Sequence, residues 1–171
     1  ELKKQLNEEF IEVKRGCMIA VSAISNIGDK ILLSNGEEIC YTKRKKKALR
    51  EELQKKQELM IAKISKKKLP LTPEEYGKYY KICDSLPFAF TDIEMVFNEE
   101  KKAVDWIFRY GNEALATLEK LPLDKMIGNS FSSLFSNMDA KWLHVYERAT
   151  LYGETLEIMD YSPEIDTNLK I

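Results

Sequence analysis

Few residues in this sequence could carry out covalent chemistry. His144 is the only imidazole, so no catalytic triad can be assembled around a histidine. The cysteines Cys17, Cys40 and Cys83 are not spaced as a zinc-binding or redox pair, and we expect them to be reduced thiols. The sequence has no glycine-rich phosphate-binding loop. We therefore expect a protein that is not an enzyme, with no catalytic residues and no metal site.

Charge is distributed in a way that could serve binding. The net charge is −1, yet residues 43–68 contain twelve Lys or Arg and three Glu, whereas residues 73–171 contain ten basic and eighteen acidic residues. The positive segment could neutralise several phosphate groups, and such binding would depend steeply on salt. Its interleaved glutamates are equally typical of a solvated helix, and it lacks the aromatic residues that stack on bases. The opposed charges indicate two functional parts.

The composition is typical of a cytoplasmic protein with a packed core. Hydrophobic residues make up 44% of the chain and charged residues 32%. The longest apolar stretch, residues 18–24, is far shorter than the roughly 20 residues of a membrane-spanning helix. The charged residues 1–8 do not resemble a signal peptide. We expect no membrane partner and a cytoplasmic location.

Two kinds of element precede the acidic half. Residues 1–42 contain short alternating apolar runs, and Asn35-Gly36 between two of them predicts a β-hairpin, so this segment is expected to be β-rich. Residues 43–68 contain no Gly or Pro and many strong helix formers, which predicts a long helix. The apolar stripe of this helix is weak and consists of Leu49, Leu53, Met60 and Ile64. Most of the helix surface would then be exposed, so we expect the helix to link domains or to pair with a second copy.

Residues 72–171 predict an α+β domain. Thr72, Pro73 and Glu75 form a capping box that begins a helix. Asn112 is expected to cap a helix that follows two alternating strands. The strands are predicted over 88–97 and 103–110, further short helices over 122–127, 131–135 and 140–152, and two more strands over 155–161 and from 168 onwards.

Two segments of this half carry a family resemblance. Residues 107–114 (IFRYGNEA) resemble the PAS motif in which a strand ends in Asn and a helix begins. Residues 123–130 (LDKMIGNS), continued by Leu134-Phe135, resemble the PAS motif that follows it. The chain from about residue 87 to residue 171 thus resembles a PAS sensor domain. The resemblance implies a five-stranded antiparallel sheet with short helices on one face, of which the final strand is not visible in the sequence.

The PAS resemblance also implies a space between sheet and helices. That space either holds a small-molecule ligand or is filled by side chains, and we favour a filled core because aromatic residues usually pack. The cofactor, if one is bound, is unknown. Some PAS domains hold haem through a histidine in this region, but we interpret His144 as an ordinary helix residue. The candidates for lining the space are Phe90, Trp106, Phe108, Asn112, Phe131 and Trp142, with a mainly structural, capping role expected for Asn112.

The first half resembles a different family. Residues 10–24, 31–39 (ILLSNGEEI) and 42–46 (TKRKK) resemble a strand pair, a hairpin and the start of the terminal helix of LytTR-type DNA-binding domains. The resemblance covers about residues 1–55, the C-terminal half of such a domain. It implies contact with duplex DNA through four residues: Lys14, Arg15, Lys43 and Arg44.

This chain departs from the LytTR pattern where the family reads bases. Lys14 stands where His is usual, Gly16 where Ser is usual and Ala20 where Asn is frequent. Lys and Arg can satisfy phosphates, which positions a protein on DNA without specifying a sequence. We therefore expect phosphate contacts, and the alternative that these are solvated charges stays open.

Together these features predict a homodimeric signal-transduction or transcription regulator. We expect a β-rich LytTR-like half domain over 1–42, a basic linking helix over 43–68 and a PAS-like sensor over 72–171. In this interpretation the sensor, which binds a small-molecule ligand or pairs subunits, acts through the helix on the DNA-binding part. The alternative is a PAS sensing or dimerisation module of a larger signalling protein, with no DNA binding.

Overall fold

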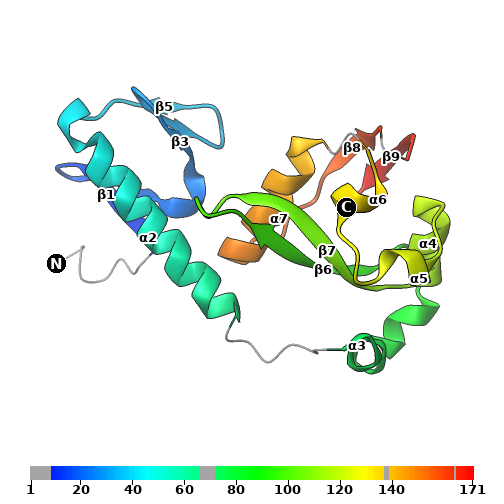
Figure 1. The fold of residues 1–171 in the computed structure, drawn as a ribbon. Helices are drawn as coiled ribbons and strands as arrows, with labels where there is room; N and C mark the ends of the chain where they lie inside the picture. Colours follow the sequence, from blue (N-terminus) through cyan, green and yellow to red (C-terminus); the bar gives the residue numbers. More distant parts are fainter. Residues whose placement is uncertain (1–8, 66–71, 137–138, 164) are drawn as a thin grey trace. The chain divides into compact units, whose positions relative to one another are not determined.

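A computed structural model describes residues 9–65, 72–136, 139–163 and 165–171 of the chain. The chain forms two compact units, Glu1–Lys66 and Lys67–Ile171. Each unit combines helices with small antiparallel sheets, which confirms a mixed α+β class (Figure 1). None of the helices in the described ranges is both long and apolar enough to cross a membrane.

The first unit contains two small antiparallel sheets. Strand β1 (Phe10–Lys14) pairs with β2 (Cys17–Ala20), and a second sheet follows the order β3 (Ile24–Ile27), β4 (Ile31–Leu33), β5 (Glu38–Ile39). The hairpin predicted at Asn35-Gly36 joins β4 to β5, which confirms that prediction. Gly36 takes a φ of +85° there, a conformation that glycine adopts without strain. The buried apolar residues of this unit are Ile11, Val13, Ile19, Val21, Ile27, Ile31 and Leu49.

The predicted long helix is present as α2 (Lys46–Ser65), preceded by a single 3-10 turn η2 (Lys43–Lys45). Residues 66–68 of the predicted helix lie outside the described ranges. Leu49 is 3% exposed, and α2 contacts both β1 and β3. The start of α2 therefore packs on the strands of the first unit, and the structure groups the whole described helix with that unit.

The second unit begins with α3 (Pro73–Tyr79) and the 3-10 segment η3 (Lys81–Ser85). The predicted capping box is confirmed in both directions. The Glu75 N–H donates to Thr72 Oγ1 at 3.3 Å, and the Thr72 N–H donates to Glu75 Oε2 at 3.1 Å. These bonds satisfy backbone donors that the first turn of any helix leaves free.

The predicted order of the remaining elements is also confirmed. The antiparallel hairpin of β6 (Thr91–Phe97) and β7 (Ala103–Gly111) leads into a series of helices and then a second hairpin. The helices are α4 (Glu113–Glu119), α5 (Leu123–Met126), α6 (Phe131–Leu134) and α7 (Ala140–Tyr152), and the second hairpin consists of β8 (Met159–Ser162) and β9 (Thr167–Lys170). Helices α4 to α7 contribute buried side chains to one core with β6 and β7.

The first strand of this unit is shorter than predicted, and Asn112 supplies the reason. Residues 88–90 were expected to begin the strand that the structure starts at Thr91. The Phe90 N–H donates to Asn112 Oδ1 at 3.0 Å, and the Phe88 carbonyl accepts from Asn112 Nδ2 at 3.0 Å. A side chain thus takes backbone groups that a longer strand would use in its ladder.

The strands of the second unit form two separate hairpins rather than one sheet. The outer edge of β7 is occupied, because Gly128 N donates to Phe108 O at 2.8 Å and Phe108 N donates to Asn129 O at 3.2 Å. No backbone hydrogen bond between described residues joins β6 or β7 to β8 or β9. The two hairpins still share one hydrophobic core, to which Ile158 and Leu169 contribute. The five-stranded sheet implied by the PAS resemblance is not formed by the described residues, which supply four strands.

Candidate functional site

Two of the predicted DNA contacts, Lys14 and Arg15, lie at the tight turn between β1 and β2. The turn is possible because Gly16 adopts a φ of +74°, which a residue with a Cβ rarely does. Both side chains are exposed. Neither forms a hydrogen bond or ion pair with a residue in the described ranges, so both charges are available to a ligand.

The other two predicted contacts, Lys43 and Arg44, lie in η2 immediately before α2. Lys45, which the resemblance did not single out, completes the same exposed turn and could have been found from the unbroken basic run alone. None of these three side chains pairs with a described residue. The first turn of α2 contains no acidic residue, although the positive end of a helix dipole favours acids there. The start of α2 is therefore strongly electropositive.

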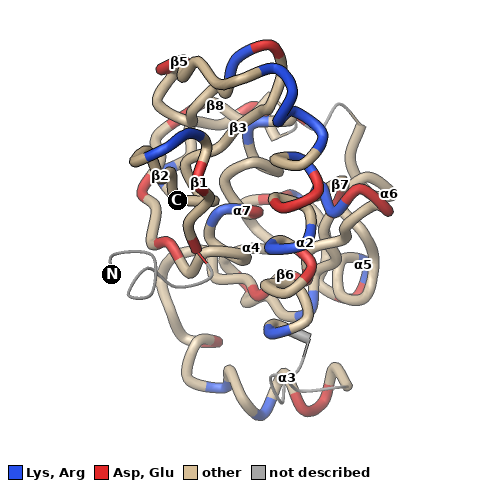
Figure 2. The backbone as a smooth tube through the Cα atoms, turned by 90° about the vertical axis from the view of Figure 1, so that its left-hand side faces the viewer, with Lys and Arg blue, Asp and Glu red and all other residues tan. Residues whose placement is uncertain are grey.

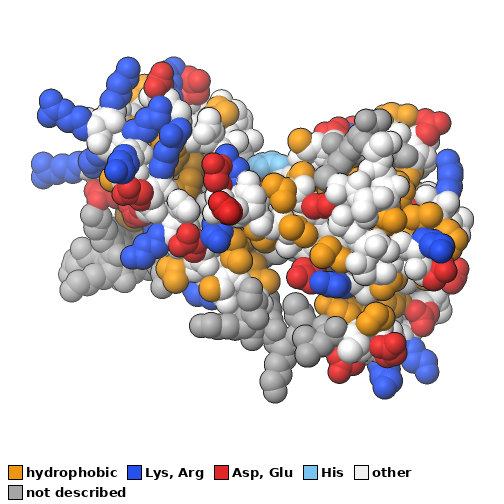
Figure 3. Space-filling model, in the orientation of Figure 1, with side chains coloured by type: hydrophobic (Ala, Val, Ile, Leu, Met, Phe, Trp, Pro, Cys, Tyr) orange, Lys and Arg blue, Asp and Glu red, His pale blue; other side chains and the backbone are white. Residues whose placement is uncertain are grey.

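The two basic segments lie on the same side of the first unit. Figure 2 shows the basic turn between β1 and β2 and the basic start of α2 both facing the viewer, and Figure 3 shows Lys and Arg side chains projecting from this unit. The segments that carry the four predicted DNA contacts therefore lie on one side of the first unit. We call it the basic surface, and it consists of Lys14, Arg15, Lys43, Arg44 and Lys45.

Four of the six candidate pocket residues meet in the core of the second unit. These four, Trp106, Phe108, Phe131 and Trp142, are each 3–6% exposed. The ring centroids of Trp106 and Phe131 are 4.4 Å apart, and those of Phe131 and Phe135 are 4.7 Å apart. Rings at these separations pack directly on one another. The aromatic side chains therefore fill space between β7 and the helices.

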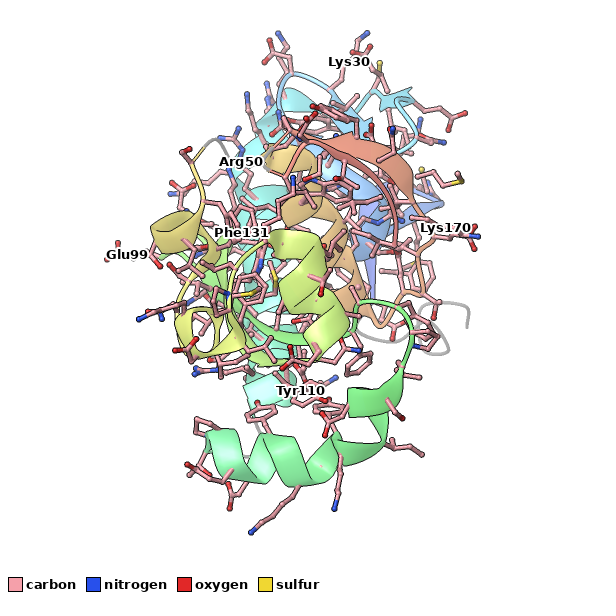
Figure 4. All side chains as sticks on the ribbon, turned by 90° about the vertical axis from the view of Figure 1, so that its right-hand side faces the viewer. Lys30, Arg50, Glu99, Tyr110, Phe131 and Lys170 are labelled. Atoms are coloured by element: carbon pink, nitrogen blue, oxygen red, sulfur yellow. The ribbon has the colours of Figure 1, made fainter. Side chains whose placement is uncertain are left out.

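The other two candidates, Phe90 and Asn112, lie apart from this core. Phe90 belongs to an aromatic cluster with Tyr80 and Tyr110, at centroid distances of 5.3 and 5.9 Å. In Figure 4, Tyr110 lies beside α3, whereas Phe131 lies among the later helices. The six candidates thus occupy two places, of which only the one around Phe131 matches the expected space between sheet and helices.

Both polar atoms of the Asn112 side chain are hydrogen-bonded within the protein. Asn112 is 1% exposed, its Oδ1 accepts from Phe90 N and Leu115 N at 3.0 Å each, and its Nδ2 donates to Cys83 O at 3.1 Å and Phe88 O at 3.0 Å. The bond from Leu115 N is the predicted helix cap. With four partners inside the protein, this side chain has little capacity left for a ligand.

Two tyrosine–carboxylate pairs near Asn112 were missed from the sequence. Tyr80 donates its hydroxyl to Asp92, and Tyr110 donates its hydroxyl to Asp84. Burial, followed by the bond to Asp92, raises the pKa of Tyr80, and burial, followed by the bond to Asp84, raises the pKa of Tyr110. Both hydroxyls are therefore held neutral, and the pairs attach α3 and η3 to the β6–β7 hairpin.

A partly buried carboxylate, Asp105, organises the start of α6. Asp105 accepts from Trp106 N at 2.8 Å, from Ser132 N at 3.2 Å and from Ser132 Oγ at 2.5 Å. Burial raises the pKa of Asp105, but the hydrogen bonds from Ser132 and Trp106 outweigh it, so the pKa is lowered overall. This carboxylate is a structural acceptor that ties α6 to β7.

The remaining reactive residues are dispersed. His144 is exposed on α7, and the three cysteines are free thiols. Within the described ranges no three His, Cys, Asp or Glu residues come together as a metal site.

Comparison with protein-family models, with curated proteins and with solved structures finds no match to this chain. Family membership therefore does not assign a function to either unit.

Proposed function

We propose that the chain is a non-enzymatic regulatory protein whose first unit binds duplex DNA through phosphate contacts and whose second unit is a PAS-like module. The observation that carries this proposal is the basic surface, on which Lys14, Arg15, Lys43, Arg44 and Lys45 are exposed and make no pair with described residues. Keeping five like charges on one side of a small unit is unfavourable without a partner. An anionic polymer such as duplex DNA removes that repulsion.

The chemistry of this surface fits phosphates better than bases. Lys and Arg bind phosphate oxygens, which fixes the position of a protein on DNA but carries no sequence information. Each phosphate that the surface neutralises releases counterions, so affinity should fall steeply as salt rises. We expect binding with weak sequence preference.

The second unit supports a PAS-like role through the order of its elements. A strand pair is followed by short helices and a second strand pair. Asn112 occupies the junction between β7 and α4, as the PAS motif implies. The contacts between Trp106 and Phe131 favour a core filled by side chains over a small-molecule site. Native mass spectrometry of freshly purified protein tests whether a ligand is carried.

Titration of fluorescently labelled duplex DNA, followed by anisotropy, tests the DNA-binding part of the proposal. We expect binding near 50 mM salt and a loss of at least about tenfold in affinity near 200 mM salt. The variant K43Q/R44Q should weaken binding at low salt. The matched control K78Q/K81Q removes two exposed charges from the second unit and should leave the affinity unchanged. Absence of binding by the unmodified chain at low salt would remove DNA from the proposed function.

A pairing module without DNA binding is the second candidate. It is favoured by three large apolar side chains around η3, because Tyr79, Ile82 and Phe88 are 69%, 82% and 59% exposed. Exposed apolar side chains gathered in one segment are typical of protein interfaces, and a second copy of the chain is the partner we propose. Sedimentation equilibrium should detect a dimer that the variant I82S weakens. A monomer at all concentrations would exclude this candidate.

A further inference from the structure

The segment that carries most of the basic surface is fixed at both of its ends to one turn of the first unit. Before it, Tyr41 donates its hydroxyl to the carbonyl of Gly28 at 2.5 Å. After it, Arg50 donates from Nε at 2.9 Å and from Nη2 at 2.7 Å to the carbonyl of Ile27. Ile27 is the last residue of β3, and Gly28 is the first residue of the connection between β3 and β4. The basic segment at residues 43–45 thus lies between two anchors that converge on neighbouring carbonyl groups.

We propose that Arg50 is a positioning residue, which together with Tyr41 holds the basic surface in the geometry that phosphate binding requires. The inference rests on the proposed function. Lys43, Arg44 and Lys45 have no side-chain partners in the described ranges that could hold them, so their placement depends on the backbone. That backbone is held by Tyr41 and Arg50.

The geometry of Arg50 distinguishes it from a phosphate ligand. Two of its N–H groups converge on a single oxygen of Ile27, a residue that is only 3% exposed. A planar guanidinium makes this paired contact, whereas the point charge of lysine cannot reproduce it. The adjacent residue Leu49 is buried at 3% exposure, which holds the first turns of α2 against the strands. Arg50 is therefore engaged with its own unit, while the basic surface next to it is free.

A third contact at the same turn adds little to the anchor. Lys46 Nζ lies 3.4 Å from Asp29 Oδ1, and the Asp29 side chain is 84% exposed. Exposed ion pairs of this kind contribute little to stability. The positioning role is therefore assigned to the hydrogen bonds of Arg50 and Tyr41. A basic surface held in place before binding loses less conformational freedom when DNA binds.

The variant R50K separates positioning from direct contact, because it keeps the charge and loses the paired hydrogen bonds. We expect R50K to weaken duplex DNA binding by about three- to tenfold and to speed amide hydrogen exchange at residues 43–50 in the free protein. R44Q serves as the comparison. It should reduce the slope of log affinity against log salt by about 0.9 and leave amide exchange unchanged.

Two results would overturn the assignment. If R50K had the same DNA affinity and the same amide exchange as the unmodified chain, the paired hydrogen bonds would not hold the basic segment in place. If R50K bound DNA more weakly but had unchanged amide exchange at residues 43–50, Arg50 would contact DNA directly. Y41F, which lacks only the hydroxyl donated to Gly28, should act in the same direction and replaces R50K if that variant does not fold. If the unmodified chain binds no DNA, the proposed function fails, whereas the exchange experiment still tests the anchor.

Discussion

Asn112 and Phe90 bind each other through two reciprocal hydrogen bonds. The Phe90 N–H donates to Asn112 Oδ1 at 3.0 Å, and the Asn112 N–H donates to Phe90 O at 3.2 Å. The side chain of Asn112 is buried and also donates to the carbonyls of Cys83 and Phe88. One residue thus holds the segment before β6 against the junction between β7 and α4.

Replacing Asn112 by alanine should destabilise the second unit severely. N112A removes the cap of α4 and leaves partly buried backbone groups of Phe90, Cys83 and Phe88 without their partner. Loss of a cap costs about 0.5–2 kcal/mol, and buried unsatisfied groups add about 1–3 kcal/mol each before relaxation and water entry. We expect a loss of about 2–4 kcal/mol in the free energy of unfolding, measured with urea.

Two further variants give this measurement its controls. N129A removes an exposed asparagine whose Nδ2 donates to Lys125 O at 3.0 Å, and it should change stability by less than about 0.5 kcal/mol. N112D keeps the cap acceptor but loses the donors to Cys83 and Phe88, so it should still be clearly destabilised. A stability of N112A equal to that of N129A would contradict the structural role assigned here.

The short-range features of the fold could be predicted from the sequence because their determinants are local. The capping box at Thr72 and Glu75 and the cap at Asn112 follow from residues three positions apart, and the β4–β5 hairpin follows from Asn35-Gly36. Each depends on side chains that bond the nearest backbone groups. The mixed α+β class and the order of the elements follow from the same local patterns.

The contact of Phe90 with Tyr110 could not be predicted, because it depends on a bulge in β7. The register between β6 and β7 shifts between Asp92 and Ile93. Asp92 pairs with Tyr110 but Ile93 pairs with Phe108, so the extra residue, Arg109, lies in β7. This bulge turns Tyr110 away from the core face on which Phe108 lies. Phe90, which lies opposite Ile93 by simple alternation, therefore packs against Tyr110. Alternation along the sequence does not reveal where such a bulge occurs.

The anchor of the basic surface was missed for a different reason. Arg50 bonds a carbonyl 23 residues earlier in the chain, and Tyr41 bonds one 13 residues earlier. Neither contact has a local pattern, because each depends on how α2 returns to the strands of its unit. In the sequence Arg50 is one more positive charge in a basic run. Only the fold shows that Arg50 is bonded within its unit whereas Arg44 is bonded to no described residue.

The two tyrosine–carboxylate pairs predict a stability that falls in alkaline solution. Burial and the bonds to Asp92 and Asp84 raise the pKa of Tyr80 and Tyr110 in the folded state above the ordinary value of 10.0. Their contribution is therefore fully present below about pH 10 and is lost as pH rises further, since the unfolded chain ionises first. Urea midpoints measured between about pH 8 and about pH 11 should show this fall.

The variant Y80F/Y110F should flatten that alkaline dependence and lower stability at neutral pH. Removing both hydroxyls leaves nothing to ionise at these two positions. Y79F is the matched control, because Tyr79 is 69% exposed, and it should leave the dependence as in the unmodified chain. An equally steep alkaline fall in Y80F/Y110F would contradict the assignment.

The N-terminus of α7 should loosen from β8 in acid. Lys141 Nζ lies 3.0 Å from Asp160 Oδ2 and donates to Tyr161 O at 2.7 Å. The hydrogen bond from Lys141 lowers the pKa of Asp160. The stabilisation is therefore present above the ordinary carboxyl pKa and is lost as pH falls through the lowered value. Amide protection factors of β8 should decrease below about pH 4.

K141M tests directly whether Lys141 holds α7 against β8. It should reduce protection of β8 at neutral pH and remove the additional loss in acid, because no cation remains to favour the ionised Asp160. K170M breaks the exposed pair of Lys170 with Glu157, which are 3.0 Å apart, and should retain the acid dependence at β8. Acid dependence that persists unchanged in K141M would show that other carboxylates control this region.

Asp29 should act as a competitor of DNA for Lys46. Its carboxylate lies 3.4 Å from Lys46 Nζ and is 84% exposed, close to the start of α2. D29N removes this negative charge and releases Lys46 toward a bound phosphate. If the first unit binds DNA as proposed, D29N should bind duplex DNA more tightly, and the slope of log affinity against log salt should steepen by up to about 0.9. E100Q, which removes an exposed acid of the second unit, should change neither quantity. Weaker binding by D29N would mean that the Asp29–Lys46 pair supports the basic surface instead of competing with it.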